Sequence, residues 1–182
     1  MHFIGNHGTD EKCVSSILKN GFIPSKGKKQ WYGRGVYFFI DGINSSSIDK
    51  LAEQWAKDQA YNKETKKTNY SQYAIIEAKI ISEKDTTIDL REDDAQKAIN
   101  HVRDTIKNIC NSKNIRMCDD EIWLFMENKF GIKAIITNTY IKFGYERIKR
   151  IDSRINNCTI ISVLDQNIID KNSIKLIRKG DI

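Results

Sequence analysis

The chain has 182 residues, of which 40% are hydrophobic and 30% charged; this fits one globular domain over residues 1–182 and excludes an intrinsically disordered chain. No apolar run approaches the roughly 20 residues that a membrane-spanning helix needs, so a membrane protein is excluded as well. The net charge of +6 favours a polyanionic partner such as nucleic acid.

The cysteines indicate a reducing compartment. The 4 cysteines form no CxxC pair and have no metal-type spacing with the histidines. The N-terminus also lacks the basic-then-apolar pattern of a signal peptide. We therefore expect reduced thiols, a cytoplasmic protein and no bound metal.

The first third of the chain predicts strand, helix, strand and helix in turn. Residues 2–7 predict a short strand, and a helix over 11–19 has Asp10 as its cap and Gly21 at its end. The segment "GVYFFI" is a strand by its β-branched and aromatic content. The serines 45–47 offer a cap for the second helix. The apolar positions of the two helices are Val14, Ile17 and Leu18, and then Leu51, Ala52, Trp55, Ala56 and Ala60.

The remaining chain mixes strands and helices without regular alternation. Strands are expected at "YAIIEAKII", "TTIDL", "KAIITNT", "TIISVLD" and "SIKLI", and "KETKKTNYS" is expected to be a charged loop. Helices are expected over 91–110 and 119–129. Their inward residues are Ala95, Ile99, Val102 and Ile106 in the first, and Ile122, Phe125 and Met126 in the second. This order predicts an α+β fold.

Two short motifs carry the chemistry that we expect. His7-Gly8-Thr9 ends the first strand, where His7 and Thr9 offer hydrogen bonds and Gly8 lets a flat amide approach the backbone. In "GRGVYFF", two glycines allow a tight bend into the strand, and Tyr37 presents a rigid ring face for stacking. A backbone clamp beside an aromatic platform suits a planar carboxamide such as nicotinamide.

"HGT" followed by "WYGRGVYFF" resembles the paired motifs of ADP-ribosyltransferases of the PARP and diphtheria-toxin type. The resemblance takes in about residues 3–60, including "ILKNGFIPS" and the serine-initiated helix with Trp55. It implies a split, mixed or antiparallel sheet flanked by helices, and NAD as the substrate.

By this resemblance, His7 holds the adenosine ribose, Gly8 clamps the nicotinamide amide, and Tyr37 stacks on the nicotinamide ring. Ser45 bonds the same amide, and Trp55 offers the second face of the stack. The resemblance also places Thr9, Tyr32 and Gly35 beside NAD. Ser45 has a simpler interpretation as a helix cap, and Trp55 as part of a buried helix face.

The family's usual Glu, which stabilises the positively charged transition state, is missing. Its position falls on Thr159 or Ile160, and we take Thr159 as the third catalytic position with His7 and Tyr37. Three other carboxylates are candidates to replace it: Glu77, Glu121 and Asp152. The missing Glu argues against polymer synthesis and leaves single transfer open.

The sequence therefore favours an NAD-dependent mono-ADP-ribosyltransferase of the toxin or phage-defence kind, with RNA favoured over protein as the acceptor and an antitoxin protein as a further partner. The alternatives are a tRNA 2′-phosphotransferase and an inactive module that binds NAD or ADP-ribose. A group of basic residues flanks the expected site and fits either a functional basic patch or an ordinary solvated loop: Lys26, Lys28, Lys29 and Arg34. The basic and aromatic stretch 142–154 fits either single-stranded nucleic-acid binding or a surface strand.

Overall fold

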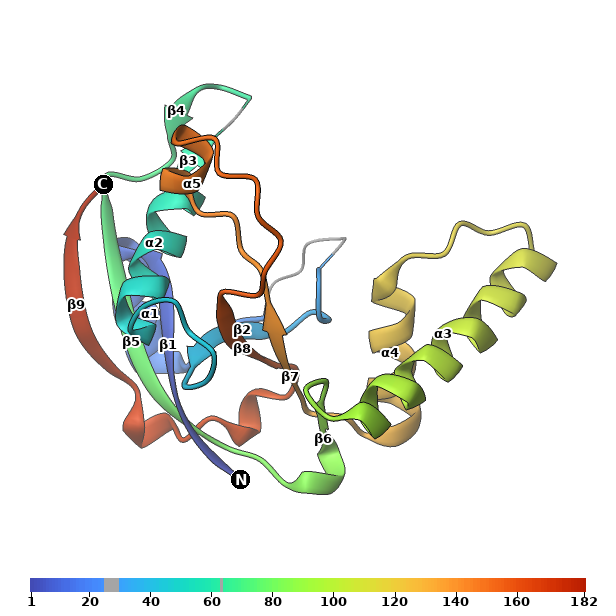
Figure 1. The fold of residues 1–182 in the computed structure, drawn as a ribbon. Coiled ribbons are helices and arrows are strands. Elements are labelled where there is room, and N and C mark those ends of the chain that lie inside the picture. Colours follow the sequence, from blue (N-terminus) through green and yellow to red (C-terminus); the bar gives the residue numbers. More distant parts are fainter. Residues whose placement is uncertain (25–29, 63) are drawn as a thin grey trace.

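The computed structural model describes residues 1–24, 30–62 and 64–182, and its centre is a seven-stranded β-sheet (Figure 1). The strands lie in the order β6-β7-β8-β2-β1-β5-β9, and all neighbours are antiparallel except the parallel pair β6 and β7. Their bounds are β1 His2–Asp10, β2 Val36–Ile40, β5 Gln72–Ile81, β6 Thr87–Asp89, β7 Ala134–Thr139, β8 Cys158–Val163 and β9 Lys175–Asp181. The expected α+β class, with a mostly antiparallel sheet flanked by helices, is confirmed.

Strands β1 and β2 are paired over only a short length, and this positions the site. β1 pairs with β5 from His2 to Asp10, but with β2 only at Gly5↔Ile40 and Asn6↔Phe39. Beyond these pairs, the side chain of His7 makes the next contact between the two strands. The sheet therefore has an opening between β1 and β2 at the end that carries His7.

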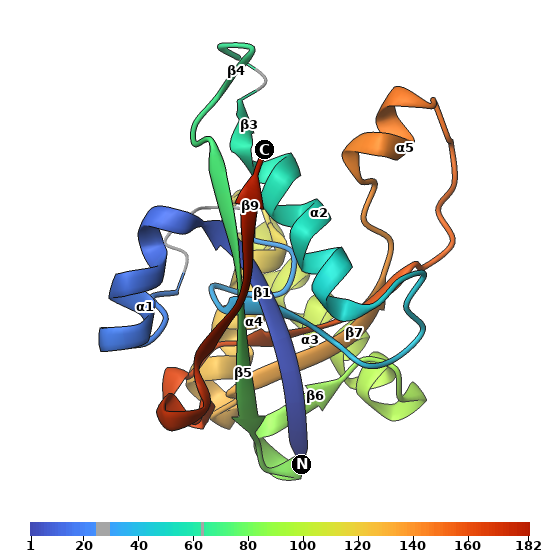
Figure 2. The ribbon, with the colours of Figure 1, turned by 90° about the vertical axis from the view of Figure 1, so that its left-hand side faces the viewer.

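Two helices cover opposite faces of the sheet beside this opening (Figure 2). A 3₁₀ turn, Glu11–Cys13, leads into α1, Val14–Asn20, and Gly21 ends this helix with φ +84°. Helix α2, Ile48–Ala60, follows Ser47 as its N-cap and buries Leu51, Ala52, Ala56 and Ala60. Both helices agree with their predicted patterns, except that Leu18 of α1 is exposed instead of packed on the sheet.

Helices α3, Asp93–Ser112, and α4, Asp119–Phe130, form a hairpin that extends away from the sheet (Figure 1). Ile106, Ile122 and Met126 are buried in the core that joins the hairpin to β7, as their spacing predicts. Phe125 is only half-buried. In the part of the chain that the structure describes, no helix is both long and apolar enough to cross a membrane.

Two surface segments differ from their predicted form. A small hairpin of β3, Tyr61–Asn62, and β4, Lys67–Thr68, follows α2, and its second strand falls within the expected loop "KETKKTNYS". In the basic stretch 142–154, the short helix α5, Gly144–Ile148, replaces the surface strand that we considered. Its start is fixed by two carboxylates: Glu146 accepts a hydrogen bond from the Phe143 amide, and Asp58 accepts one from the Gly144 amide.

Three further 3₁₀ turns, at Lys84–Thr86, Gln166–Ile168 and Lys171–Ser173, connect the strands. All 4 cysteines are free thiols. Cys110 and Cys158 are buried, whereas Cys13 is exposed on the turn before α1.

Candidate functional site

His7 connects β1 to β2 at the opening of the sheet. Its Nδ1 atom lies 2.8 Å from the carbonyl oxygen of Tyr37, and its ring packs 5.3 Å from Phe22 and 5.7 Å from Phe38, measured between ring centroids. Burial lowers the pKa of His7, so the ring is neutral at pH 7. Because a carbonyl oxygen only accepts, Nδ1 carries the proton, and Nε2 is left as a hydrogen-bond acceptor.

Tyr37 uses its hydroxyl group for structure and leaves its ring for other contacts. The hydroxyl donates to the carbonyl of Gly33 and accepts from the amide of Tyr32, both at 2.9 Å. Burial raises the pKa of this hydroxyl, so it stays protonated. These bonds fix the ring in one position, as a stacking platform requires.

A segment that we call the strap, Gln30 to Gly33, is held by two further hydrogen bonds. The amide of Gln30 donates to Asp120 at 3.1 Å, and the indole of Trp123 donates to the carbonyl of Trp31 at 3.0 Å. Both partners belong to α4, so the helical hairpin fixes the strap. At Gly33, φ is +77° and an added Cβ atom would lie 2.8 Å from the Leu164 side chain, so the position suits glycine alone.

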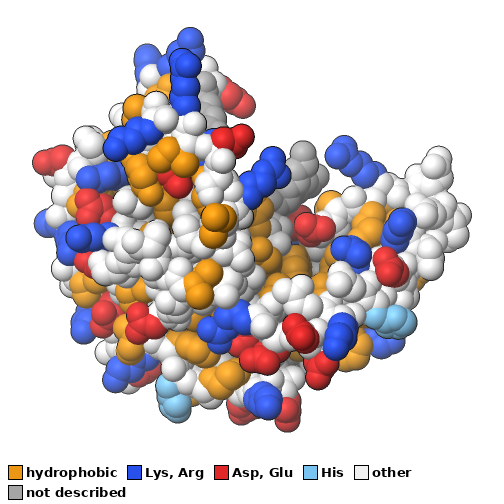
Figure 3. All heavy atoms as spheres, in the orientation of Figure 1, with side chains coloured by type: hydrophobic (Ala, Val, Ile, Leu, Met, Phe, Trp, Pro, Cys, Tyr) orange, Lys and Arg blue, Asp and Glu red, His pale blue; other side chains and the backbone are white. Residues whose placement is uncertain are grey.

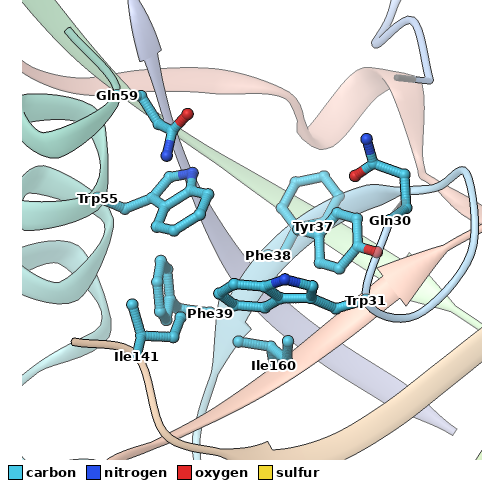
Figure 4. A pocket seen from close by; sticks show the side chains of 9 residues that line it. All are labelled: Gln30, Trp31, Tyr37, Phe38, Phe39, Trp55, Gln59, Ile141 and Ile160. Atoms are coloured by element: carbon cyan, nitrogen blue, oxygen red, sulfur yellow. The ribbon is translucent and has the colours of Figure 1, made fainter. Parts of the chain in front are cut away.

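The strap and α2 enclose a hollow of about 240 Å³, here called the aromatic hollow (Figure 4). Trp31 and Trp55 point into it from the strap and from α2, with ring centroids 6.1 Å apart. The other lining residues are Tyr37, Phe38, Phe39, Ile141 and Ile160, with the carboxamides of Gln30 and Gln59 at its rim. A planar ring with one polar substituent fits such a lining.

A second hollow of about 570 Å³, here called the His7 hollow, adjoins the first. It lies between β1, α1 and the strap, and its polar lining includes His7, Thr9, Lys12 and Ser16. The two hollows share four lining residues: Gln30, Tyr37, Trp55 and Gln59. The molecule therefore presents one bipartite site with an aromatic part and a part rich in hydrogen-bonding groups.

The structure brings five of the predicted site residues together here. His7, Thr9 and Gly35 line the His7 hollow, and Tyr37 and Trp55 line both hollows. Gly35 is closely packed on its other side, since an added Cβ atom would lie 2.4 Å from Ser162 Oγ. Trp55 was interpreted either as a stacking face or as part of a buried helix face, and it has both positions at once. Its indole is partly buried on α2 and also faces the hollows.

Gly8 and Tyr32 lie beside the site and do not line either hollow. Gly8 is buried under α2, where an added Cβ atom would lie 2.0 Å from the carbonyl oxygen of Ala52. Its lack of a side chain therefore lets the helix pack on β1. The ring of Tyr32 turns toward Trp123, with 6.1 Å between centroids, while its amide holds the Tyr37 hydroxyl.

Ser45 and Thr159 are not brought to the site. Ser45 is exposed in the loop before α2, and its amide donates to the Asn157 carbonyl at 2.9 Å. Thr159 is fully buried; its hydroxyl donates to Asn138 at 2.7 Å and accepts from the Ile43 amide at 3.1 Å. Of the two positions considered for the family Glu, Ile160 is the one that lines the aromatic hollow.

No carboxylate from the described residues lines either hollow. Glu77 pairs with Lys175 on the sheet edge at 2.9 Å, Glu121 caps α4, and Asp152 is an exposed side chain 3.9 Å from Lys142. The buried Asp120 is linked to the site indirectly, because it accepts the hydrogen bond from the Gln30 amide that holds the strap. The expected substitute for the Glu is therefore not found among our three candidates.

Among the lining residues that the sequence analysis missed are Gln30, Trp31 and Gln59. The sequence could have indicated Gln59, because this residue lies four positions after Trp55 on the same helix face. The positions of Gln30 and Trp31 depend on α4, about 90 residues away, and no local pattern indicates them. Lys26, Lys28 and Lys29 lie outside the described residues, and Arg34 is exposed next to the strap.

Comparison with known proteins gives one similarity. A stretch of 85 residues, 46% of this chain, is 31% identical to the uncharacterized protein MJ0359 of Methanocaldococcus jannaschii. That stretch spans about a third, 35%, of the archaeal protein's length. No family model and no solved structure matches the chain.

Proposed function

We propose that the chain is an NAD-dependent mono-ADP-ribosyltransferase, which transfers one ADP-ribose and releases nicotinamide. The observation that carries this proposal is the bipartite site: an aromatic hollow and a His7 hollow joined through Tyr37 and Trp55. A dinucleotide that has a planar carboxamide at one end and ribose hydroxyls beside it matches this pair of environments. The resemblance of the two motifs to the family agrees with the same assignment.

In this proposal the nicotinamide ring stacks in the aromatic hollow against Tyr37 and Trp55. The Gln59 carboxamide at the rim is suited to bond the carboxamide of the ligand. His7, with Nε2 as an acceptor, binds a ribose hydroxyl that donates to it. Binding at both ends positions the ribosyl carbon between the hollows, and positioning is a large part of catalysis for this reaction.

The transfer needs little acid catalysis from the protein. Nicotinamide in NAD is cationic, so it leaves with the electron pair of the C–N bond as a neutral molecule. Positive charge develops on the ribosyl group, and a lone pair of the acceptor forms the new bond as the acceptor loses a proton to solvent. The aromatic faces of Tyr37 and Trp55 are electron-rich and suit a cationic ring or a developing positive charge.

Among the described residues the lining holds no carboxylate, which favours a second candidate, a module that binds NAD without turning it over. A carboxylate opposite the developing charge is worth several kcal/mol in the transition state, on the order of other charge-stabilising groups. The two functions share the binding site and differ in turnover alone.

Incubation of the pure protein with NAD labelled on the adenylate tests the proposal, with RNA, single-stranded DNA and a cell lysate offered in parallel. We expect label on RNA with the wild type, and none with His7→Ala or Tyr37→Ala. His2→Ala and Tyr61→Ala are matched controls, because both side chains are exposed and neither lines a hollow.

If labelled product and released nicotinamide are absent from every tube while NAD still binds, the module is the function. Label on lysate protein alone would reassign the acceptor to protein. Label that persists in His7→Ala and Tyr37→Ala would contradict the site itself.

A further inference from the structure

A third hollow of about 350 Å³ lies on the other side of the strap, between it and the α3–α4 hairpin. Its aromatic wall consists of Trp31 and Tyr32 from the strap and Trp123 from α4, and its opposite wall comes from α3. Figure 3 shows a notch between the sheet body and the hairpin, with hydrophobic side chains in its floor and Lys or Arg side chains on both sides.

Trp31 is the wall between this hollow and the aromatic hollow. It lines both, and 51% of the residue remains exposed. The hydrogen bond from Trp123 to its carbonyl oxygen fixes its backbone at 3.0 Å. A group bound in the third hollow therefore lies one indole away from the place where the nicotinamide end of NAD is proposed to bind.

The polar lining of the third hollow comes from one face of α3. Gln96, Asn100 and Arg103 follow one another at helical spacing, i, i+4 and i+7, and all three line the hollow. The side-chain NH2 group of Gln96 donates to the Leu90 carbonyl at 2.6 Å, and the side-chain carbonyl oxygen of Gln96 is left as an acceptor. Carboxamides and a guanidinium beside aromatic rings are the groups that read the edge of an unpaired base and stack on its face.

The charges around the third hollow favour a base inside it and phosphates outside it. Asp119 belongs to the lining and repels a phosphate placed inside the hollow. Two arginines offer positive charge to phosphates outside it: Arg103, half exposed and 3.9 Å from Asp104, and Arg34, exposed beside the strap. The net charge of +6 favours a polyanion, such as a nucleic acid, as the partner.

We propose that the third hollow binds an unpaired base of a single-stranded nucleic acid, and that this strand is the acceptor of the transfer. The acceptor role rests on the proposed function; binding of the strand does not. A base inside a duplex is stacked on both faces and cannot enter the hollow, so single strands bind better than duplexes.

The test measures binding without NAD, as the anisotropy of a fluorescent 12-nucleotide RNA, about the length that one such site contacts, at physiological salt. The variant Asn100→Ala/Arg103→Ala removes one amide and one positive charge from the hollow. The control Lys97→Ala/Asn108→Ala removes the same two groups from exposed positions of α3 that do not line it. Both are surface changes, and thermal unfolding checks that both variants fold.

We expect the hollow variant to weaken binding of the single strand about tenfold, in line with contacts to one base. The control should weaken it by less than about twofold, as loss of one remote charge does. Equal losses in the two variants, no binding by the wild type, or equal affinity for the strand and its duplex would each overturn the proposal.

Nicotinamide release from NAD, assayed on the same preparations, keeps the two proposals distinct. Both variants should release nicotinamide at the wild-type rate without acceptor, because none of the four substituted residues lines the aromatic hollow or the His7 hollow. Strand binding that depends on the hollow, without any NAD turnover, would overturn the proposed function and leave the binding site standing. Turnover with label on protein only would overturn the third hollow as the acceptor site.

Discussion

The three expected catalytic residues lie in two places: His7 and Tyr37 at the opening between β1 and β2, and Thr159 at the start of β8. The two places differ in whether their polar groups are open toward a hollow. At the opening, His7 has Nε2 available and Tyr37 has its ring facing two hollows. At the start of β8, the Thr159 hydroxyl is fully buried and both donates and accepts within the protein. Polar groups whose hydrogen bonds are all made internally stabilise the fold, whereas groups left open toward a hollow are available to a ligand.

Substitution of Gly8 is expected to cause the largest loss of stability, because Gly8 serves the packing of the fold and does not line a hollow. Gly8→Ala puts a Cβ atom 2.0 Å from the Ala52 carbonyl oxygen, so α2 must move. We expect a loss of about 3 kcal/mol in the free energy of unfolding, measured in urea. Gly131→Ala is the control: nothing lies within 4 Å, and its φ of +65° alone costs about 1 kcal/mol. Equal losses would show that α2 does not pack on Gly8 as described.

Thr159→Val keeps the shape of the side chain and removes its hydroxyl. Asn138 and the Ile43 amide then lose a partner inside the protein, which should lower the free energy of unfolding by about 2 kcal/mol. NAD affinity should stay unchanged, because Thr159 lines neither hollow. A folded Thr159→Val protein that has lost NAD binding would return this residue to the site.

His7 predicts a pH dependence of stability. Burial lowers its pKa below the ordinary value of 6.5, so the unfolded chain takes up a proton before the folded protein does. The neutral His7 therefore contributes to the free energy of unfolding in full above pH 6.5. This contribution is lost as the pH falls below that value toward the folded-state pKa. His7→Gln should remove this slope from chemical unfolding measured between pH 5 and 7.5, and the exposed His2→Gln should keep it. An unchanged slope in His7→Gln would assign it to another group.

Ser45 gives the smallest effect. Its side chain is exposed and remote from both hollows, and its structural contact is made by the backbone amide. Ser45→Ala should change stability by less than about 0.5 kcal/mol and leave NAD affinity within error. A clear drop in affinity would mean that the loop before α2 closes over the ligand.

Periodicity and local composition were enough to predict most of the fold. The apolar spacing of α2, α3 and α4, and the β-branched runs of β5, β7 and β8, gave elements that agree with the structure within a few residues. The segments that differ, α5 and the β3–β4 hairpin, are short and exposed, and α5 depends on the Asp58 carboxylate more than 80 positions away. No local pattern contains that information.

The candidate site was predictable on one side only. His7, Thr9, Tyr37 and Trp55 meet because β1, β2 and α2 are neighbours in sequence and in space. The strap depends on Asp120 and Trp123, whose contacts with it arise only in the folded chain. Ser45 and Thr159 were placed by motif spacing. Spacing does not indicate how the loop before α2 positions Ser45, or which face of β8 carries Thr159.

The most direct test of the central claim is the equilibrium binding of NAD, measured by calorimetry on the wild type, Tyr37→Ala and Thr159→Val. The account predicts binding by the wild type and by Thr159→Val, and a loss of at least about tenfold in Tyr37→Ala, the order expected for a stacked ring. Equal affinity in the wild type and a folded Tyr37→Ala protein would contradict the account, as would the absence of NAD binding by the wild type.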